Sequence, residues 1–320
     1  MYPTLTTVGP WRPVHLPAVF AFFVGLVWVW TYFERRQDDR EMRLTFGLVA
    51  ELVVQAAVPT AAIYLIVNRL GPLEVRSWGV MVLLSFVAAA TWMYLDRDRY
   101  DFTGTQVLHV ALLGFAGGII GGRLGYVLLN LSEYAQEPLG ALNLWSGGMS
   151  WHGGVAGALL VLAIGTRITG VTLARAFDLS APAVALAYAI ARVGCFLNGC
   201  CWGRSADLPW AVVFPPEAAG PSGVPLHPAQ LYAVAGTLLF TLPALLALGR
   251  WLRKPFDRFL GFLVLSSVVR FVVEVFRRGA SAEVFGPIPQ LTIAQVASLA
   301  IIAVGVVVIL VRERPEPRAG

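Results

Sequence analysis

Hydrophobic residues in this chain come in runs of 17 to 24 positions, and short polar stretches between the runs hold most of the charged residues. A helix that crosses the hydrocarbon core of a bilayer needs about 20 mainly apolar residues. The pattern therefore predicts an all-α, polytopic integral membrane protein with about nine transmembrane helices. The predicted segments are residues 16–33, 47–67, 77–95, 106–129, 149–165, 178–198, 228–249, 258–276 and 291–311.

The composition supports this prediction. Of the 320 residues, 57% are hydrophobic and only 13% are charged, and the mean hydropathy is +0.70. Soluble globular domains usually carry about 25% charged residues. Nine spanning segments also use up most of the chain, so the sequence excludes both an ordinary soluble protein and a sizeable soluble domain.

The net charge of +5 is typical of proteins that bind nucleic acid, but the placement of the basic residues indicates another cause. If the N-terminus lies outside and the segments alternate, fifteen lysines and arginines fall at cytoplasmic ends and six on the outer side. An excess of basic residues on the cytoplasmic side is the usual pattern in membrane proteins. The charge therefore indicates topology, and no nucleic-acid partner is expected. The three remaining arginines lie inside apolar runs: Arg123, Arg192 and Arg270.

We divide the chain into an extra N-terminal hairpin (1–69), a membrane domain (70–312) and a cytoplasmic tail (313–320). Eight identities at an offset of 62 residues suggest that the hairpin copies 71–131, although apolar helices also resemble one another by composition. The first apolar run ends in Thr31-Tyr32-Phe33-Glu34, without a small-residue cleavage site, so we expect a spanning helix there. Residues 203–227, rich in proline and glycine, predict an ordered, non-helical loop.

A charged side chain at the bilayer centre costs several kcal/mol, so each intramembrane arginine suggests a functional site. Snorkelling to the headgroups is the alternative, because each arginine lies six or seven residues from the outer end of its segment. Convergence weakens that alternative. Three segments end near an arginine, and others begin on the same side with polar residues: His152, His227, Gln230 and Tyr232.

Other features of these segments allow both a structural and a functional interpretation. Two interleaved glycine rows in 106–129 predict close helix packing. His152 precedes Gly153-Gly154, and a single histidine is as often a structural hydrogen-bonding group as a base. Arg270 and Glu274 are four residues apart, so an intrahelical ion pair alone would make this arginine tolerable in lipid.

The three cysteines, Cys195, Cys200 and Cys201, are too few for a disulfide framework. We expect them to be small apolar fillers, or Cys195 to form a disulfide with one of the other two if the site faces an oxidising compartment. The four histidines are dispersed, so neither a metal site nor a cofactor is predicted. Several arginines at headgroup depth are best suited to a lipid phosphate, which a guanidinium group binds through two hydrogen bonds.

Six motifs between residues 70 and 312 resemble, in order, those of the prolipoprotein diacylglyceryl transferase family of bacterial inner membranes. The first is Gly71-Pro72 with Ser77-Trp78-Gly79. The others are Gly121-Gly122-Arg123-Leu124-Gly125-Tyr126, Gly148-Met149-Ser150-Trp151-His152-Gly153-Gly154, Arg192-Val193-Gly194-Cys195-Phe196-Leu197-Asn198-Gly199 with Trp202-Gly203-Arg204, His227-Pro228-Ala229-Gln230-Leu231-Tyr232, and Arg270-Phe271-Val272-Val273-Glu274-Val275-Phe276-Arg277.

The resemblance implies transfer of a diacylglyceryl group from phosphatidylglycerol to the lipobox cysteine of a prolipoprotein signal peptide, with release of glycerol phosphate. It also implies a multi-pass protein of the bacterial inner membrane, with its site toward the periplasmic leaflet and in contact with membrane lipids. By this resemblance the catalytic residues are His152, Arg192 and Arg270. The implied substrate-binding residues are Arg123, Tyr126, Asn198, Gly203, His227, Gln230, Tyr232 and Glu274.

The chain departs from the family pattern at several of these positions. The family usually has Asn where Cys195 stands, Glu where Cys200 stands, Tyr at Trp78 and Glu at Ala233. The lost carboxylate at position 200 leaves room for a changed acceptor. Two alternatives therefore stay open: a paralogue that uses the same lipid chemistry on another acceptor, and a non-catalytic protein that binds or transports phospholipid.

Overall fold

The computed structural model describes residues 4–8, 73–134, 138–142, 148–249, 251–252, 254–277, 284–285 and 288–312, together with five single residues between 24 and 61. The chain divides into two compact units, Tyr2–Gly79 and Val80–Gly320. In the first unit, β1 (Thr4–Val8) pairs antiparallel with β2 (Leu73–Arg76). The predicted segments 16–33 and 47–67, the proposed repeat and the tail 313–320 lie largely or entirely outside the described residues.

Within the described residues, helices cover the other seven predicted segments, which confirms an all-α membrane fold there. Their lengths and composition make five of them capable of crossing a bilayer. The total of nine stays a prediction. The helices are α3 (Ser77–Leu95), α4 (Gly104–Leu129), α6 (Trp151–Thr169), α7 (Leu173–Asn198), α8 (Ala229–Gly236) continued by α9 (Leu242–Leu248), α10 (Asp257–Glu274) and α11 (Ile293–Arg312).

Short elements join the long helices. A 3-10 turn (Arg97–Tyr100) links α3 to α4, and α5 (Leu131–Tyr134) and a second 3-10 turn (Pro138–Leu142) follow α4. Between α10 and α11 lie two short paired strands, β3 (Val284–Phe285) and β4 (Ile288–Thr292). Residues 199–228 form the predicted non-helical loop, which isolated β-bridges hold together.

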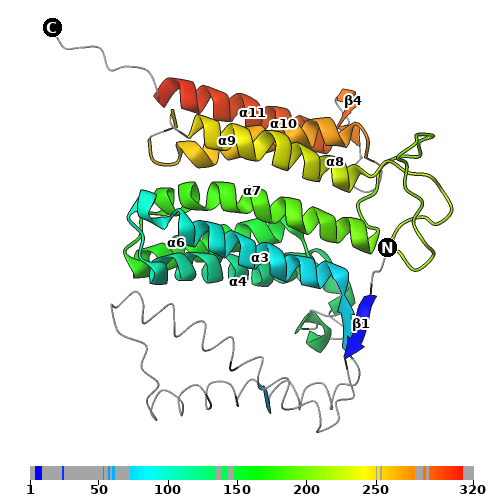
Figure 1. Ribbon diagram of the computed structural model, residues 1–320, viewed down its shortest axis with the longest axis horizontal. Helices are drawn as coiled ribbons and strands as arrows, with labels where there is room; N and C mark the ends of the chain where they lie inside the picture. Colours follow the sequence, from blue (N-terminus) through cyan, green and yellow to red (C-terminus); the bar gives the residue numbers. More distant parts are fainter. Residues whose placement is uncertain are drawn as a thin grey trace. The chain divides into compact units, whose positions relative to one another are not determined.

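In the second unit, α7 lies between two groups of helices, α3, α4 and α6 on one side and α8 to α11 on the other (Figure 1). Helices α4 and α6 pack almost backbone to backbone, because glycines face each other along the contact. A Cβ atom on Gly117 would lie 2.7 Å from the Gly157 carbonyl oxygen, and one on Gly121 would lie 2.6 Å from the Gly157 Cα. The glycine rows of the sequence thus form a close helix pair, as predicted.

The helix that begins at Ala229 changes its hydrogen-bonding pattern midway. Thr237–Thr241 form a π-helical turn between α8 and α9. Pro243, at the start of α9, has no N–H to donate, and such a missing donor favours a locally widened turn. Residues Ala229–Leu248 still form one continuous helical segment, so the predicted segment 228–249 is a single helix with an irregular centre.

The end of the bundle with the most basic residues is held by buried ion pairs. Arg258, which is 3% exposed, donates from Nη1 to Asp96 Oδ2 at 3.0 Å and to the Tyr100 hydroxyl at 2.6 Å. Asp178 accepts from the backbone N–H groups of Phe256 and Phe259 at 2.6 and 2.9 Å. These contacts connect α3, α7 and α10 at one end, and the motifs that contain Arg192 and Arg270 lie at the opposite end.

Candidate functional site

The opposite end gathers the end of α7, the start of α8 and the end of α10. Ala229 and Ala233 of α8 form a small apolar core with Val269 and Val273 of α10. Tyr188 of α7 packs against this core. Residues that the chain separates by up to 85 positions therefore lie side by side. This packing brings Arg192 and Arg270 into one site.

Arg192 is half-buried in the last two turns of α7. Its guanidinium carbon lies 4.8 Å from the centre of the Tyr188 ring, one turn earlier on the helix, which is a cation–π contact. Its Nη1 points toward the Cys195 sulfur at 4.0 Å. A sulfur is a weak acceptor, so this contact leaves the guanidinium group able to form stronger bonds with an anion.

Arg270 shares its side of the site with a buried carboxylate. Its Nη1 lies 2.7 Å from Glu274 Oε2, and Arg277 Nη1 lies 3.9 Å from the same oxygen. Glu274 is fully buried, whereas 27% of the Arg270 side chain is exposed. Arg192, Arg277 and Tyr188 are all within electrostatic range of Arg270. The intrahelical ion pair expected from the sequence is therefore present, and it belongs to a larger cationic group.

The loop 199–228 closes over the end of α10. Gly203 N–H donates to the His227 carbonyl at 3.0 Å, and Arg204 N–H donates to the Phe276 carbonyl at 2.9 Å. A Cβ on Gly203 would lie 2.6 Å from His227 Cβ and would also collide with the Phe276 carbonyl oxygen. Gly203 therefore allows the loop to contact two backbones, and the described contacts give it a packing role.

His227 and Tyr232 form a polar and aromatic group at the start of α8. Tyr232 hydroxyl lies 3.0 Å from His227 Nδ1 and accepts from Trp210 Nε1 at 2.9 Å. Phe276 packs against both rings, with centroids 5.2 and 5.3 Å away. Burial lowers the pKa of His227, and the charge of Arg204 lowers it further, so the imidazole is neutral at pH 7.

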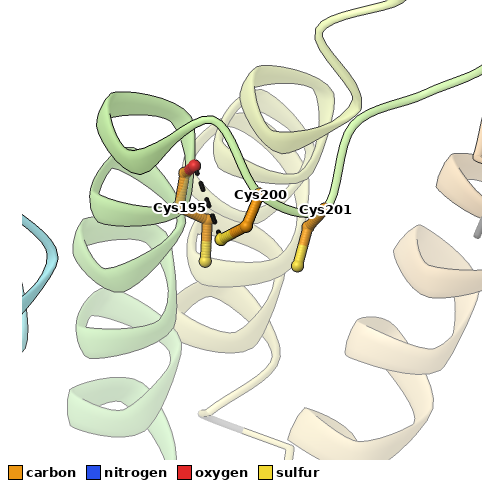
Figure 2. A group of neighbouring side chains, drawn as sticks. All are labelled: Cys195, Cys200 and Cys201. Atoms are coloured by element: carbon orange, nitrogen blue, oxygen red, sulfur yellow. Dashed lines mark hydrogen bonds between the residues drawn. The ribbon is translucent and has the colours of Figure 1, made fainter. Parts of the chain in front are cut away.

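Gln230 and the cysteines lie beside Arg192. The Gln230 amide, 1% exposed, donates from Nε2 to the Cys200 carbonyl at 2.6 Å, and its Oε1 has no hydrogen-bond partner among the described residues. All three cysteines are free thiols, and their sulfur atoms lie within 4.8 Å of one another (Figure 2). Hydrogen bonds from the Cys195 and Cys200 thiols lower the pKa of the Cys201 thiol, as do the charges of Arg192 and Arg277.

Sequence reasoning missed this thiol cluster. From the sequence, the cysteines were expected to be apolar fillers or to form a disulfide, and metal ligands were considered only among the histidines. The cluster depends on a chain reversal after Asn198, where Gly199 and Cys201 both adopt positive φ, 76° and 63°. Gly199 was the available signal, because a glycine after a helix often marks such a reversal.

Arg123 and Tyr126 belong to a second group at the end of α4. Arg123 is buried and donates from Nε, Nη1 and Nη2 to the carbonyls of Ala141, Gly148 and Gly140, at 2.8, 3.0 and 2.7 Å. Its guanidinium group also lies over the rings of Tyr126 and Tyr134. These contacts hold Gly140, Ala141 and Gly148 against α4, which gives Arg123 a structural role beside any contact with substrate.

His152 lies in the first turn of α6, next to this second group. Its side chain lies outside the described residues. The backbone around it is well fixed: Ser150 N–H donates to the Gly122 carbonyl at 2.8 Å, and Ser150 Oγ accepts from Gly153 N–H at 3.2 Å. Asn198 ends α7, and its carbonyl accepts from Ala219 N–H at 3.1 Å.

Most of the chain is similar to known proteins. The family model described as prolipoprotein diacylglyceryl transferase matches residues 65–311. The phosphatidylglycerol–prolipoprotein diacylglyceryl transferase of Aeromonas hydrophila is 35% identical over 77% of this chain and 90% of its own length. The enzymes of the same name from Geobacter sulfurreducens and Solidesulfovibrio magneticus are 39% and 36% identical, over 65% and 78% of this chain and 80% and 94% of their own lengths.

The chain belongs to the prolipoprotein diacylglyceryl transferase family. The resemblance seen in six short motifs is thereby confirmed, and it extends over nearly the same residues, 65–311 against 70–312. Membership also agrees with the apolar helices of the fold, which make this a multi-pass membrane protein.

Proposed function

We propose that this chain transfers the diacylglyceryl group of phosphatidylglycerol to the lipobox cysteine of prolipoprotein signal peptides, forming a thioether and releasing glycerol phosphate. Family membership over three quarters of the chain carries the proposal. The positive-inside charge pattern supports a bacterial inner-membrane location with the arginine site toward the periplasmic leaflet. There the site would open to membrane lipids and to the signal peptide.

In the proposed mechanism, Arg192 and Arg270 hold the lipid phosphate. Negative charge grows on this phosphate as the carbon–oxygen bond to the diacylglyceryl group breaks, and fixed cations in a site of low dielectric constant stabilise that charge most. The partial exposure of Arg270 and the weak contact of Arg192 with sulfur support this role. Glu274 would orient Arg270 through the 2.7 Å ion pair.

The remaining site residues would bind and position the substrates. His152 would help the acceptor thiol, whose ordinary pKa is about 8.5, to ionise. Gln230 Oε1 is a buried acceptor without a hydrogen-bond partner in the part of the chain that the structure describes. Binding roles are also proposed for Arg123, Tyr126, Asn198, Gly203, His227 and Tyr232.

Complementation tests the proposed reaction. A bacterium depleted of its own transferase should recover the lipid-dependent mass shift of a reporter lipoprotein when it produces this chain. Arg192→Ala and Arg270→Ala should each reduce the rate by about 100-fold or more, because each removes a preorganised cation. Arg175→Ala, at an exposed ion pair with Asp101 at the other end of the bundle, should leave the rate unchanged.

Two outcomes would overturn the proposal. Well-expressed chain that binds phosphatidylglycerol without lipidating the reporter would identify a lipid-binding protein or a paralogue with another acceptor. Wild-type rates in Arg192→Ala or Arg270→Ala would exclude the phosphate-holding role of that arginine.

A further inference from the structure

The three cysteine sulfurs are placed like the ligands of a metal ion. Figure 2 shows them on the same side of the turn that follows α7, and all three lie within 4.8 Å of one another. Zinc binds thiolates at roughly 2.3 Å, so sulfur ligands of a tetrahedral zinc ion lie roughly 3.8 Å apart. The separations in this structure therefore exceed that spacing by at most about 1 Å.

The backbone that presents the sulfurs is held without any ion. Cys200 N–H donates to the Cys195 carbonyl at 3.1 Å, and the buried Gln230 amide fixes the Cys200 carbonyl at 2.6 Å. Cys201 adopts a φ of 63°, a conformation that is unfavourable for a non-glycine residue and persists only where its surroundings impose it. A Cβ on Gly199 would lie 2.6 Å from the Ala218 side chain, so the loop packs tightly against the turn.

Cationic side chains near the cysteines would balance the negative charge of such a site. Three thiolates and one divalent cation carry a single net negative charge, and a buried charge needs a partner of opposite sign. Arg192 Nη1 lies 4.0 Å from the Cys195 sulfur, and Arg192 and Arg277 are both within electrostatic range of Cys201. Soft sulfur ligands select zinc, copper(I) or iron–sulfur clusters over magnesium or calcium.

We propose that Cys195, Cys200 and Cys201 bind one Zn²⁺ ion and that its open fourth position takes the thiol of the acceptor cysteine. The second half of this proposal rests on the proposed function. Zinc sites with three protein ligands keep a fourth position for a reacting group, and a thiol that binds a metal ion loses its proton. Zinc fits better than copper(I) because it readily takes a fourth ligand and undergoes no redox change.

The group transfer then follows with balanced charge. The acceptor thiol binds Zn²⁺ as a thiolate and gives up one proton, for which His152 is the proposed acceptor. Its sulfur attacks the glycerol carbon of the diacylglyceryl group, where a carbon–sulfur bond forms and the carbon–oxygen bond to phosphate breaks. The electron pair of that bond leaves with the phosphate oxygen, and glycerol phosphate departs with one more negative charge than the lipid headgroup carried. Arg192, beside the cysteines, would hold this oxygen.

Metal analysis of the purified full chain tests the first half of the proposal. Protein from zinc-supplemented cells should contain about one zinc per chain by mass spectrometry, and Cys195→Ser, Cys200→Ser and Cys201→Ser should each retain less than a fifth of that amount. Ser222→Ala, in the exposed part of the same loop, is the matched control and should keep the full content. Removing zinc from the wild-type chain with a chelator and restoring it gives the same comparison without a variant that could misfold.

Cobalt replacement tests the second half. Co²⁺ bound to the wild-type chain should show sulfur-to-cobalt charge-transfer absorption, which increases when a signal peptide with its lipobox cysteine is added. The same peptide with serine in place of cysteine should leave the spectrum unchanged. An unchanged spectrum with both peptides would overturn the open position, and copper, iron, a disulfide or no bound metal would overturn the zinc site. Zinc binding without any lipidation would instead count against the proposed function alone.

Discussion

Glu274 is fully buried between two arginines and can neutralise only one of them. Its Oε2 lies 2.7 Å from Arg270 Nη1 and 3.9 Å from Arg277 Nη1. Two guanidinium groups and one carboxylate leave one positive charge, and Arg192 adds another within electrostatic range. A phospholipid headgroup with a single negative charge, which gains a second as the phosphate leaves, matches this excess.

Glu274→Gln should keep the shape of this side chain and remove its charge. Removing the charge of one partner in a buried ion pair costs about 3–5 kcal/mol, so the free energy of unfolding in detergent should fall by about that amount. The rate should also fall about 100-fold, because a displacement of Arg270 by about 1 Å is enough to cause such a loss. Thermal unfolding and a lipidation assay measure the two effects.

The exposed ion pair between Arg97 and Asp98 is the control for Glu274→Gln. Asp98 is 82% exposed, and exposed pairs contribute about 0–1 kcal/mol, so Asp98→Asn should change neither measurement. If Glu274→Gln proved as harmless as Asp98→Asn, Glu274 would not position Arg270.

At the scale of elements, the glycine contact between α4 and α6 fixes the start of α6, which carries His152. Ser150 and His152 begin α6 directly beside Gly122 and Gly125 of α4. Since the two backbones touch, the position of the α6 N-terminus depends on the absence of side chains along the contact. A carbon added at Gly117, Gly121 or Gly125, where the facing helix lies within 3 Å of the new atom, must push the helices apart.

Gly121→Ala should separate the two helices, because its Cβ would lie 2.6 Å from the Gly157 Cα. Overpacking of this kind costs about 1–3 kcal/mol, which chemical unfolding in detergent can resolve. On the same helix, a Cβ on Gly118 would meet nothing closer than the Gly154 carbonyl at 4.0 Å. Gly118→Ala should therefore keep or slightly raise the stability, and equal losses in both variants would exclude close packing as the cause.

The helices could be predicted where apolar runs end at charges. Segment 77–95 matches α3 at both bounds because Arg76 and Asp96 flank it. Segment 178–198 began five residues too late, because α7 starts at Leu173 and includes Arg175. The hydropathy pattern excluded Arg175, whose side chain is exposed and paired with Asp101, whereas Asp178 was already inside the predicted segment and accepts from backbone N–H groups at the start of α10.

The site could be predicted only in part. Spacing along the chain was enough to place Arg270 and Glu274 in contact, since residues four apart share a helix face. The thiol cluster also depends on the left-handed backbone of Cys201, a residue type that rarely adopts it, so Gly199 alone could indicate the chain reversal but not the position of the sulfurs. The carbonyl contacts of Arg123 could not be predicted because Gly140 and Ala141 lie in a short 3-10 turn far along the chain, which no periodic pattern indicates.

At the scale of the whole molecule, the two ends of the bundle differ in how far their basic side chains are paired with carboxylates. At the end that carries Arg258 and Arg312, these basic side chains are paired with Asp96 and Asp257. At the other end, Arg192, Arg270 and Arg277 outnumber Glu274, the carboxylate that the described residues place beside them. The excess of positive charge at that end suits the proposed anionic lipid substrate.

Reporter fusions should show this orientation directly. Green fluorescent protein fused after residue 320 should fluoresce, and alkaline phosphatase fused there should be inactive, because α11 ends at the basic end, which the positive-inside pattern predicts to be cytoplasmic. An epitope inserted after Gly223, which has open space around it, should be reached by antibody in intact spheroplasts. The reverse pattern would invert the orientation of the proposed site.

The ion pair between Asp96 and Arg258 also has a consequence for biosynthesis. The two residues are 162 positions apart, and a ribosome adds about 5–20 residues per second. Arg258 is therefore synthesised roughly 10–30 seconds after Asp96. During that interval its carboxylate stays hydrated at the membrane surface while the intervening helices leave the translocon. The bundle therefore closes at this end only after α10 has been made, and a nascent chain stalled earlier would expose Asp96, Tyr100 and Asp178 to quality-control proteases.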